Sequence, residues 1–311
     1  MSHVYQAVGI SRQAHHQHNL REAAFEERLY ALCAEADLLR EQHPGCGVEK
    51  MYQVLQPDWI GRDRFIDIMM SCGYRLRKMI NYSRTTYAGK MNYPNLIIGM
   101  LLWDSNQLWQ SDITYYRIRD AFYYLVFIID AYSKRILGYS AEEHLRASAN
   151  LKALNMAIKN AGKLKYRLIH HSDRGSQYGE RTYVQCLHDH HIDISMCLKP
   201  QENAYAERIN GIIKNEYLKC WDIPDLAALK KACRTAVEHY NTKRPHRHLP
   251  AKKTPLDFEK SLVSLDMYDR HLETVYSNDN PITKRPEPGT YFIPENIPDG
   301  PVCPVFNISQ C

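Results

Sequence analysis

The order of strand-like and helix-like segments in the central part of the chain most constrains its fold. Three consecutive segments, LWQSDITYYRI, FYYLVFIIDAY and RILGYSAEE, are rich in β-branched and aromatic residues and predict strands. Helices are predicted over 145–161, 177–190, around Glu207 and over 225–240, with short strands over 166–170 and 192–197 between them. Three strands followed by alternating helices and strands predict an α/β fold, with a mixed sheet covered by helices.

The segment before this core is predicted to be helical. Apolar periodicity predicts a helix over 21–40, and two shorter helices over 48–55 and 62–72 are separated by a turn. The basic run YRLRK follows the last of them. This order indicates a helix-turn-helix whose second helix enters a DNA major groove, while Arg75, Arg77 and Lys78 contact phosphates. A small helical bundle with a basic rim fits the periodicity equally well.

Charge and cysteine content narrow the class of protein. The net charge is only +5, but residues 61–90 and 203–260 are two locally basic blocks, which suggests two surfaces for polyanions. The nine cysteines form no CxxC pair, and MSHVYQAVGI does not resemble a signal peptide, so we expect reduced thiols in a cytosolic protein. No apolar run approaches the roughly 20 residues of a membrane helix.

Three carboxylates in the core pattern point to a metal site. Asp112 falls within a strand that should be central, Asp173 follows the strand over 166–170, and Glu207 begins an amphipathic helix. A buried ionised carboxylate is costly unless a cation pairs with it, and oxygen ligands suit Mg²⁺ or Mn²⁺. Two such ions can activate an attacking oxygen and stabilise a leaving oxygen at a phosphodiester.

Other carboxylates compete for these places. Glu202 and Glu216 are alternatives to Glu207, but at 100° per residue only Glu207 shares a helix face with Asn203 and Lys214. Asp130, in FIIDAYSK, is interpreted as a strand-end residue. We therefore expect Asp112, Asp173 and Glu207 to form the site.

Four sequence motifs add to the interpretation of the three carboxylates as a metal site. QSDITYY, HHSDRGSQY, ENAYAERINGIIKNEY and YNTKRPHRHLPAKKTPLDF, in this order, resemble the OrfB transposases of the IS-three insertion-sequence family. These belong to the DDE superfamily with the retroviral integrases, whose catalytic core is RNase H-like. The resemblance covers about residues 40–260. It implies an RNase H-like integrase core preceded by a helix-turn-helix-like region.

The resemblance also implies roles for residues. The catalytic and metal-binding triad would be Asp112, Asp173 and Glu207, holding two Mg²⁺ or Mn²⁺ ions for DNA cleavage and strand transfer. Lys214, Arg244 and Arg247 would contact DNA, together with the basic residues after the third helix. The chain departs from the family in two ways: the loop between Asp173 and Glu207 is slightly shortened, and a Glu stands at 202 where the family usually has Asp.

We expect six parts along the chain. They are a polar arm (1–20), a helical helix-turn-helix-like DNA-binding region (21–80), a linker (81–100), the catalytic core (101–242), a basic extension (243–280) and a proline-rich tail (281–311). Residues 241–258 are predicted to be irregular and to wrap around the core. The tail holds seven of the fifteen prolines, which excludes a long helix there.

The resemblance leaves two alternatives to a transposase. One is a non-catalytic DNA-binding regulator of element ends, and the other is an RNase H-like nuclease without joining activity. The expected partners are element ends and target DNA, further copies of the same chain, and an upstream-frame product or fusion. The expected location is the bacterial cytoplasm, in association with the nucleoid.

Overall fold

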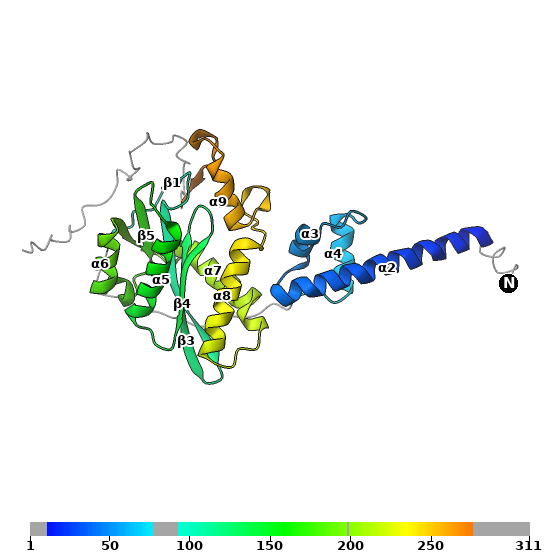
Figure 1. The fold of residues 1–311 in the computed structure, drawn as a ribbon, viewed down its shortest axis with the longest axis horizontal. Helices are drawn as coiled ribbons and strands as arrows, with labels where there is room; N and C mark the ends of the chain where they lie inside the picture. Colours follow the sequence, from blue (N-terminus) through cyan, green and yellow to red (C-terminus); the bar gives the residue numbers. More distant parts are fainter. Residues whose placement is uncertain (1–10, 77–92, 198, 276–311) are drawn as a thin grey trace, which may run out of the picture. The chain divides into compact units, whose positions relative to one another are not determined.

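The computed structural model describes residues 11–76, 93–197 and 199–275, and the chain divides into two compact units, 1–79 and 80–311 (Figure 1). Each unit is built around its own apolar core. Arg77, Lys78 and the proline-rich tail lie outside the described residues. No helix in the described ranges is both long enough and apolar enough to cross a membrane.

The first unit consists of three helices, α2 (Arg12–Gln42), α3 (Val48–Leu55) and α4 (Arg62–Ser71). Its core is formed by Leu32 and Ala36 of α2 together with Met51, Phe65 and Met69 of the two shorter helices. The lengths of α3 and α4 and the turn between them agree with the predicted helix pair. Arg75, which follows α4, is exposed.

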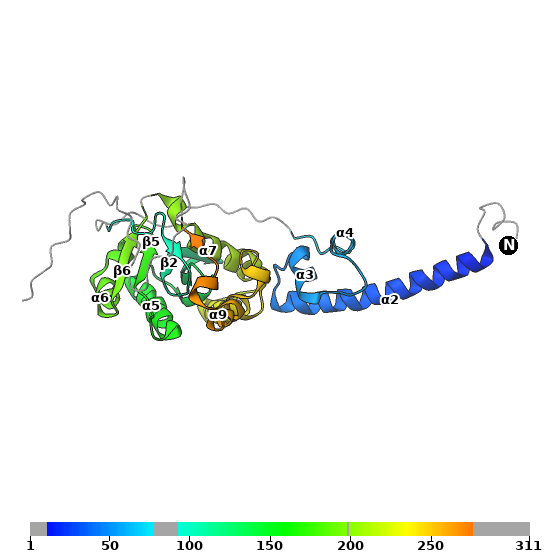
Figure 2. The same cartoon turned by 90° about the horizontal axis from the view of Figure 1, so that it is seen from above.

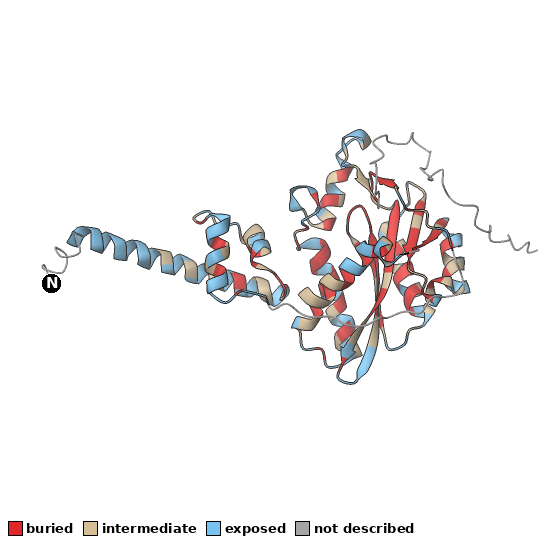
Figure 3. Ribbon diagram, turned by 180° about the vertical axis from the view of Figure 1, so that it is seen from behind, coloured by how far each residue is buried: buried red, intermediate tan, exposed pale blue. Residues whose placement is uncertain are grey.

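Helix α2 is longer than predicted. It begins at Arg12, inside the segment expected to be a polar arm, and the hydroxyl of Ser11 caps it by accepting from the Ala14 N–H at 3.0 Å. The first turns are exposed (Figure 3). Because these residues bury no apolar face, apolar periodicity could not reveal them as helical.

The second unit contains a five-stranded sheet in the order β4-β3-β2-β5-β6. Its strands are β2 (Leu108–Ile118), β3 (Ala121–Asp130), β4 (Ile136–Glu142), β5 (Leu168–Ser172) and β6 (Ile192–Met196). The first three pair antiparallel, whereas β5 runs parallel to β2 and β6 parallel to β5. This mixed sheet with β2 at its centre is the RNase H-like topology, as expected from the sequence.

Helices cover both faces of this sheet (Figure 2). They are α5 (Ala147–Ala161) and α6 (Arg181–Asp189) on one face, and α7 (Ala204–Glu216) and α8 (Leu226–Thr242) on the other. Successive residues of β3 point to opposite faces of the sheet and pack into two different apolar clusters. Phe127 packs with α7 and α8, and Ile128 packs with α5. A Cβ on Gly138 of β4 would lie 2.0 Å from the Ala153 carbonyl oxygen, so α5 can approach β4 only over a glycine.

The segment after α8 is more ordered than predicted. Helix α9 (Pro255–Val263) begins in the stretch expected to be irregular, with Pro255 at its first position and Thr254 accepting from the Asp257 N–H at 3.2 Å. The chain then reaches β7 (Glu273–Thr274), which pairs with β1 (Leu101–Leu102). Capping chemistry therefore produced a helix where proline and charge content had suggested none.

Candidate metal centre

Strand pairing brings Asp112 and Asp173 together. The parallel pairing of β2 with β5 ends at Ser111 and Ser172; Asp112 is the next residue of β2, and Asp173 directly follows the end of β5. Neighbouring strands lie about 4.8 Å apart, so the two carboxylates start from adjacent backbone positions. The sequence predicted one carboxylate within a strand and one just after another strand, and the register brings these two positions to the same level of the sheet.

Gly175 makes room for the carboxylate of Asp173. Its N–H donates to Asp173 Oδ1 at 3.0 Å, and a Cβ at this glycine would lie only 3.0 Å from the same oxygen. The φ of Gly175 is −57°, which other residues also adopt. Glycine is therefore required at position 175 for space beside the carboxylate and not for an unusual backbone angle.

Helix α7 is fixed against β2 through the face that carries Glu207. Asn203 Nδ2 donates to the Ser111 carbonyl at 2.9 Å, and Asn210 Nδ2 donates to Asp112 Oδ2 at 2.7 Å. One turn further on, Lys214 Nζ donates to Thr114 Oγ1 at 2.6 Å. These contacts follow one side of the helix, so Glu207, which lies between the two asparagines, faces the same region as Asp112.

The three carboxylates act on one another electrostatically. Burial, followed by the charges of Asp173 and Glu207, raises the pKa of Asp112 to about 7, and the hydrogen bonds from the Ile113 backbone and Asn210 oppose this. Burial and then the charge of Asp173 raise the pKa of Glu207. The arrangement therefore concentrates negative charge that a bound cation would neutralise.

The ammonium of Lys214 is directed to the hydroxyl of Thr114. Burial and the charge of Lys219 lower its pKa, against the opposing effect of Asp112, and its ammonium lies 5.5 Å from the centre of the Tyr115 ring. Among the described residues, no three His, Cys, Asp or Glu side chains are already arranged to hold a single metal ion. Further oxygen ligands would have to complete any coordination shell.

The competing glutamates have other partners. Glu202 Oε2 accepts from Asn95 Nδ2 at 2.9 Å and from the Lys199 N–H at 3.1 Å. Glu216 forms a bidentate pair with Arg244, with distances of 2.8 and 2.9 Å. Arg244 is buried and its guanidinium donates to Glu216, so the contacts that the structure shows for it lie within the protein. Arg247, by contrast, is exposed.

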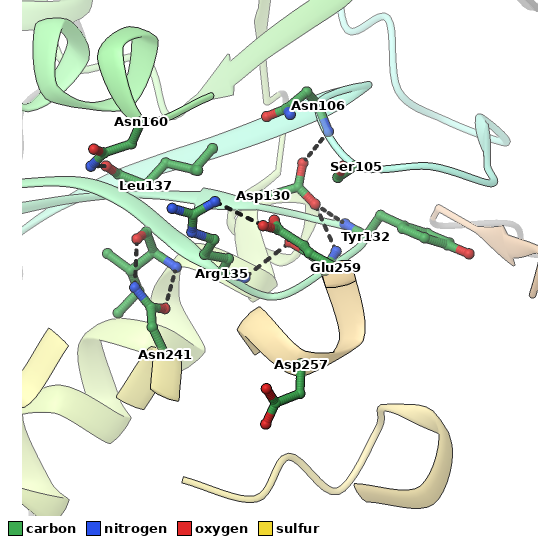
Figure 4. A network of polar contacts seen from close by, with 12 residues as sticks. Ser105, Asn106, Asp130, Tyr132, Arg135, Leu137, Asn160, Asn241, Asp257 and Glu259 are labelled. Atoms are coloured by element: carbon green, nitrogen blue, oxygen red, sulfur yellow. Dashed lines mark hydrogen bonds and ion pairs between the residues drawn. The ribbon is translucent and has the colours of Figure 1, made fainter. Parts of the chain in front are cut away.

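Asp130 lies in a separate polar network (Figure 4). Its carboxylate accepts from the backbone N–H groups of Asn106, Tyr132 and Ser133 at 2.7, 3.1 and 2.6 Å. Nearby, Glu259 of α9 pairs with Arg135 at 2.7 Å. Asp130 therefore organises the turn after β3, in agreement with its interpretation as a strand-end residue.

Two residues that support the site were not predicted. Tyr178 is buried, and its hydroxyl lies 2.9 Å from Ser111 Oγ, directly before Asp112. Thr114, which holds Lys214, lies two residues after Asp112 on the same face of β2. Strand alternation could have indicated Thr114, but nothing in the spacing of Tyr178 indicated its contact.

The chain is similar to integrase core domains and to proteins of bacterial insertion elements. Two models described as integrase core domain match residues 104–200 and 190–255. The 31 kDa protein of insertion element IS600 from Shigella sonnei is 30% identical over 196 residues, 61% of this chain and 72% of that protein. The transposase for insertion sequence element IS904 from Lactococcus lactis is 30% identical over 191 residues, 59% of this chain and 72% of that protein.

Other similarities cover a smaller part of this chain. The protein of insertion sequence element IS986/IS6110 from Mycobacterium tuberculosis is 38% identical over 120 residues, and this chain spans only 43% of its length. The HTLV-2 integrase catalytic core domain aligns with 53% of this chain and 99% of its own, at 24% identity and a TM-score of 0.41, which is too low to add to the strand order. The long matches to the IS600 and IS904 proteins establish that the chain belongs to the family of insertion-sequence transposases with an integrase core domain.

Proposed function

We propose that the protein is a DNA transposase that cleaves DNA and joins the resulting end to a second DNA strand by metal-dependent phosphoryl transfer. The observation that carries this proposal is that Asp112 and Asp173 come next after the last paired residues of β2 and β5, while Asn210, on the same helix face as Glu207, donates to Asp112. Family membership supports the same reaction class. In this proposal water is the first nucleophile and a 3′-hydroxyl the second.

The three carboxylates fit a pair of Mg²⁺ or Mn²⁺ ions. The donor set consists of oxygens alone, and its mutual repulsion would be relieved by divalent cations. Mg²⁺ is commonly held by one or two carboxylates together with substrate phosphate, so a preformed cage of three protein ligands is not required. When bound, two such ions would activate the attacking oxygen and stabilise the leaving oxygen.

Neighbouring side chains have positioning roles in this proposal. Asn210 orients the carboxylate of Asp112 through its 2.7 Å hydrogen bond. Asn203 fixes the start of α7 to β2, which sets the position of Glu207. Lys214, held by Thr114, would contact a DNA phosphate near the reacting end.

The first unit is proposed to bind DNA through its helix pair. Helices α3 and α4, joined by a short turn, have the form of a helix-turn-helix, and Arg75 is exposed just after α4. We propose that Arg75, Arg77 and Lys78 contact phosphates there, and that Arg247 does so on the second unit. The working form is proposed to be an oligomer of this chain on element ends and target DNA.

The test replaces each ligand by its uncharged isostere. Asp112→Asn, Asp173→Asn and Glu207→Gln should each abolish hydrolysis and joining of a labelled element-end duplex with Mg²⁺, and should abolish the rise in melting temperature that Mg²⁺ gives the wild type. Glu143→Gln, an exposed carboxylate outside the site, is the matched control and should leave both readouts unchanged. Full joining activity in any ligand variant would refute that residue's assignment.

The products of the wild-type protein distinguish the alternatives. Cleavage with strand-transfer product supports a transposase. Hydrolysis without joining would identify a nuclease, and binding to element ends without any Mg²⁺-dependent cleavage would identify a regulator. The same gel therefore separates all three functions.

A further inference from the structure

A cleft opens beside the helix that carries Glu207. It has a volume of about 240 Å³ and lies between α7, the turn after β3, the loop after α8, and β7. Its apolar lining comes from Ile129, Ala204, Tyr205 and Ile209, and its polar lining from Lys134, Arg208, His246, His248 and Glu273. None of these residues belongs to the carboxylate cluster.

The single acid of this lining is already satisfied. Glu273 Oε1 accepts from Lys134 Nζ at 2.6 Å and from the Tyr205 hydroxyl at 2.5 Å. The Lys134 ammonium also donates to the Ala131 carbonyl and lies 4.0 Å from the centre of the Tyr205 ring. Lys134 and Glu273 thus compensate each other inside the wall of the cleft.

Arg208 leaves the cleft with uncompensated positive charge. It is exposed, and it forms no hydrogen bond or ion pair with any residue that the structure describes. The ring of His246 lies 6.0 Å from that of His248. Burial and then the charges of Arg244 and Lys134 lower the pKa of His246 to about 3, and burial and then Arg208 lower that of His248. Neutral imidazoles can donate to an anion without adding charge.

The position of the cleft relates it to the carboxylates. Arg208 directly follows Glu207, so at 100° per residue the cleft occupies the adjoining side of the same helix. A helix with its side chains is about 10 Å across. Each nucleotide of one B-DNA strand advances about 3.4 Å along the helix axis, so a strand leaving the carboxylates could reach the cleft within about three nucleotides.

We propose that this cleft binds a phosphodiester of the DNA strand that is processed at the carboxylates, through the Arg208 guanidinium and the imidazoles of His246 and His248. This inference rests on the proposed function, because it assumes that DNA is the substrate. It adds a binding site on a different face of α7 from Lys214. Arg208 holds the strand and takes no part in bond cleavage.

The test compares two exposed arginines in the full-length protein. Binding of a labelled element-end duplex with a 3′ single-stranded extension is measured by fluorescence anisotropy in EDTA, from low to moderate salt. Arg208→Ala should raise Kd about fivefold to tenfold and reduce the slope of log Kd against log salt by about one. Arg181→Ala, which removes the same charge from an exposed position of α6 on the other face of the sheet, should change neither.

A scan of neutral methylphosphonate linkages locates the contact. One neutral linkage within about three nucleotides of the reacting phosphate should weaken binding by the wild type but not by Arg208→Ala, because the variant has already lost that contact. Arg208→Lys should recover part of the affinity. Equal affinities for Arg208→Ala and Arg181→Ala would overturn the proposal. So would a scan in which every neutral linkage weakens binding by Arg208→Ala as much as it weakens binding by the wild type.

Two further outcomes separate this proposal from others. If millimolar inorganic phosphate shifts the His248 ring signals in NMR while Arg208→Ala leaves DNA affinity intact, the cleft takes free phosphate and the proposal fails. If the wild-type protein does not cleave DNA but Arg208→Ala still weakens binding, the cleft stands and the proposed catalysis fails. Asp112→Asn should show the reverse pattern to Arg208→Ala, with binding retained and joining lost.

Discussion

Asp112 and Asp130 lie on neighbouring strands, and in each case burial is the main cause that raises the carboxyl pKa to about 7. Their partners differ. Asp130 is fully buried and accepts from three backbone N–H groups. Asp112 has the amide of Asn210 on one oxygen, and two further carboxylates raise its pKa.

The difference shows what distinguishes a structural carboxylate from a candidate metal ligand. Backbone donors satisfy Asp130, and removing it would leave those donors buried without a partner. Like charges surround Asp112, and removing it would relieve repulsion in the absence of metal. A raised pKa is common to both residues, so the identity of the neighbouring groups carries the functional information.

The largest expected effect is on activity. Asp112→Ala should lower the joining rate by on the order of a thousandfold or more, because the variant loses charge stabilisation at the reacting phosphate. In EDTA its free energy of unfolding should equal or exceed that of the wild type. The measurements are strand-transfer assays with Mg²⁺ and urea unfolding without it. A variant that joins normally but unfolds more easily would place Asp112 in the same class as Asp130.

Asp130→Ala should show the opposite pattern. We expect its free energy of unfolding to fall by about 3 kcal/mol, because three backbone N–H groups lose their acceptor in a buried turn. Urea unfolding measures this, and Glu143→Ala should stay within about 0.5 kcal/mol of the wild type. An unchanged stability would show that water or another group replaces the carboxylate.

Asn210→Ala tests the positioning of Asp112. Loss of the 2.7 Å hydrogen bond should reduce apparent Mg²⁺ affinity and joining by about tenfold to a hundredfold. Joining rates over a range of Mg²⁺ concentrations measure this, and high Mg²⁺ should recover part of the loss. A uniform loss at every Mg²⁺ concentration would point to a disturbed helix and not to a misplaced ligand.

The smallest effect concerns pH. The folded protein binds a proton at Asp130 with a pKa of about 7, compared with 3.8 in an exposed reference, so this group costs stability as pH rises from about 4 to 7. Between pH 5 and 7 in EDTA, the unfolding free energy of the wild type should fall by about 1 kcal/mol per pH unit more than that of Asp130→Asn. Parallel pH profiles would show that Asp130 stays ionised in the folded state.

Much of the core could be predicted because its strands obey simple patterns. The predicted span of β2 coincides with the observed Leu108–Ile118, since its aromatic and β-branched residues favour a central strand. Helix α2 was underestimated, because its first turns lack an apolar face. Helix α9 was missed, because proline is common both in irregular segments and at the first position of helices.

The candidate site, like the fold, could be predicted from the sequence only in part. Helix periodicity alone placed Glu207, Asn203 and Lys214 on one face, and the structure brings that face against β2. Periodicity could not show that Arg244 is paired internally with Glu216, because the partners lie 28 positions apart in the chain. Nor could it reveal the contact of Tyr178 with Ser111 or the cleft around Arg208.

The fold class and the family could be predicted from the sequence, and three carboxylates could be proposed as metal ligands, because these inferences depend on local spacing and residue chemistry. Only the tertiary structure decided which charged groups are satisfied and which are not. It joined Asp130 to backbone donors, Glu216 to Arg244, and Asp112 to two like charges. Such pairings depend on strand register and helix packing, which bring distant residues within a few ångströms and which no local pattern records.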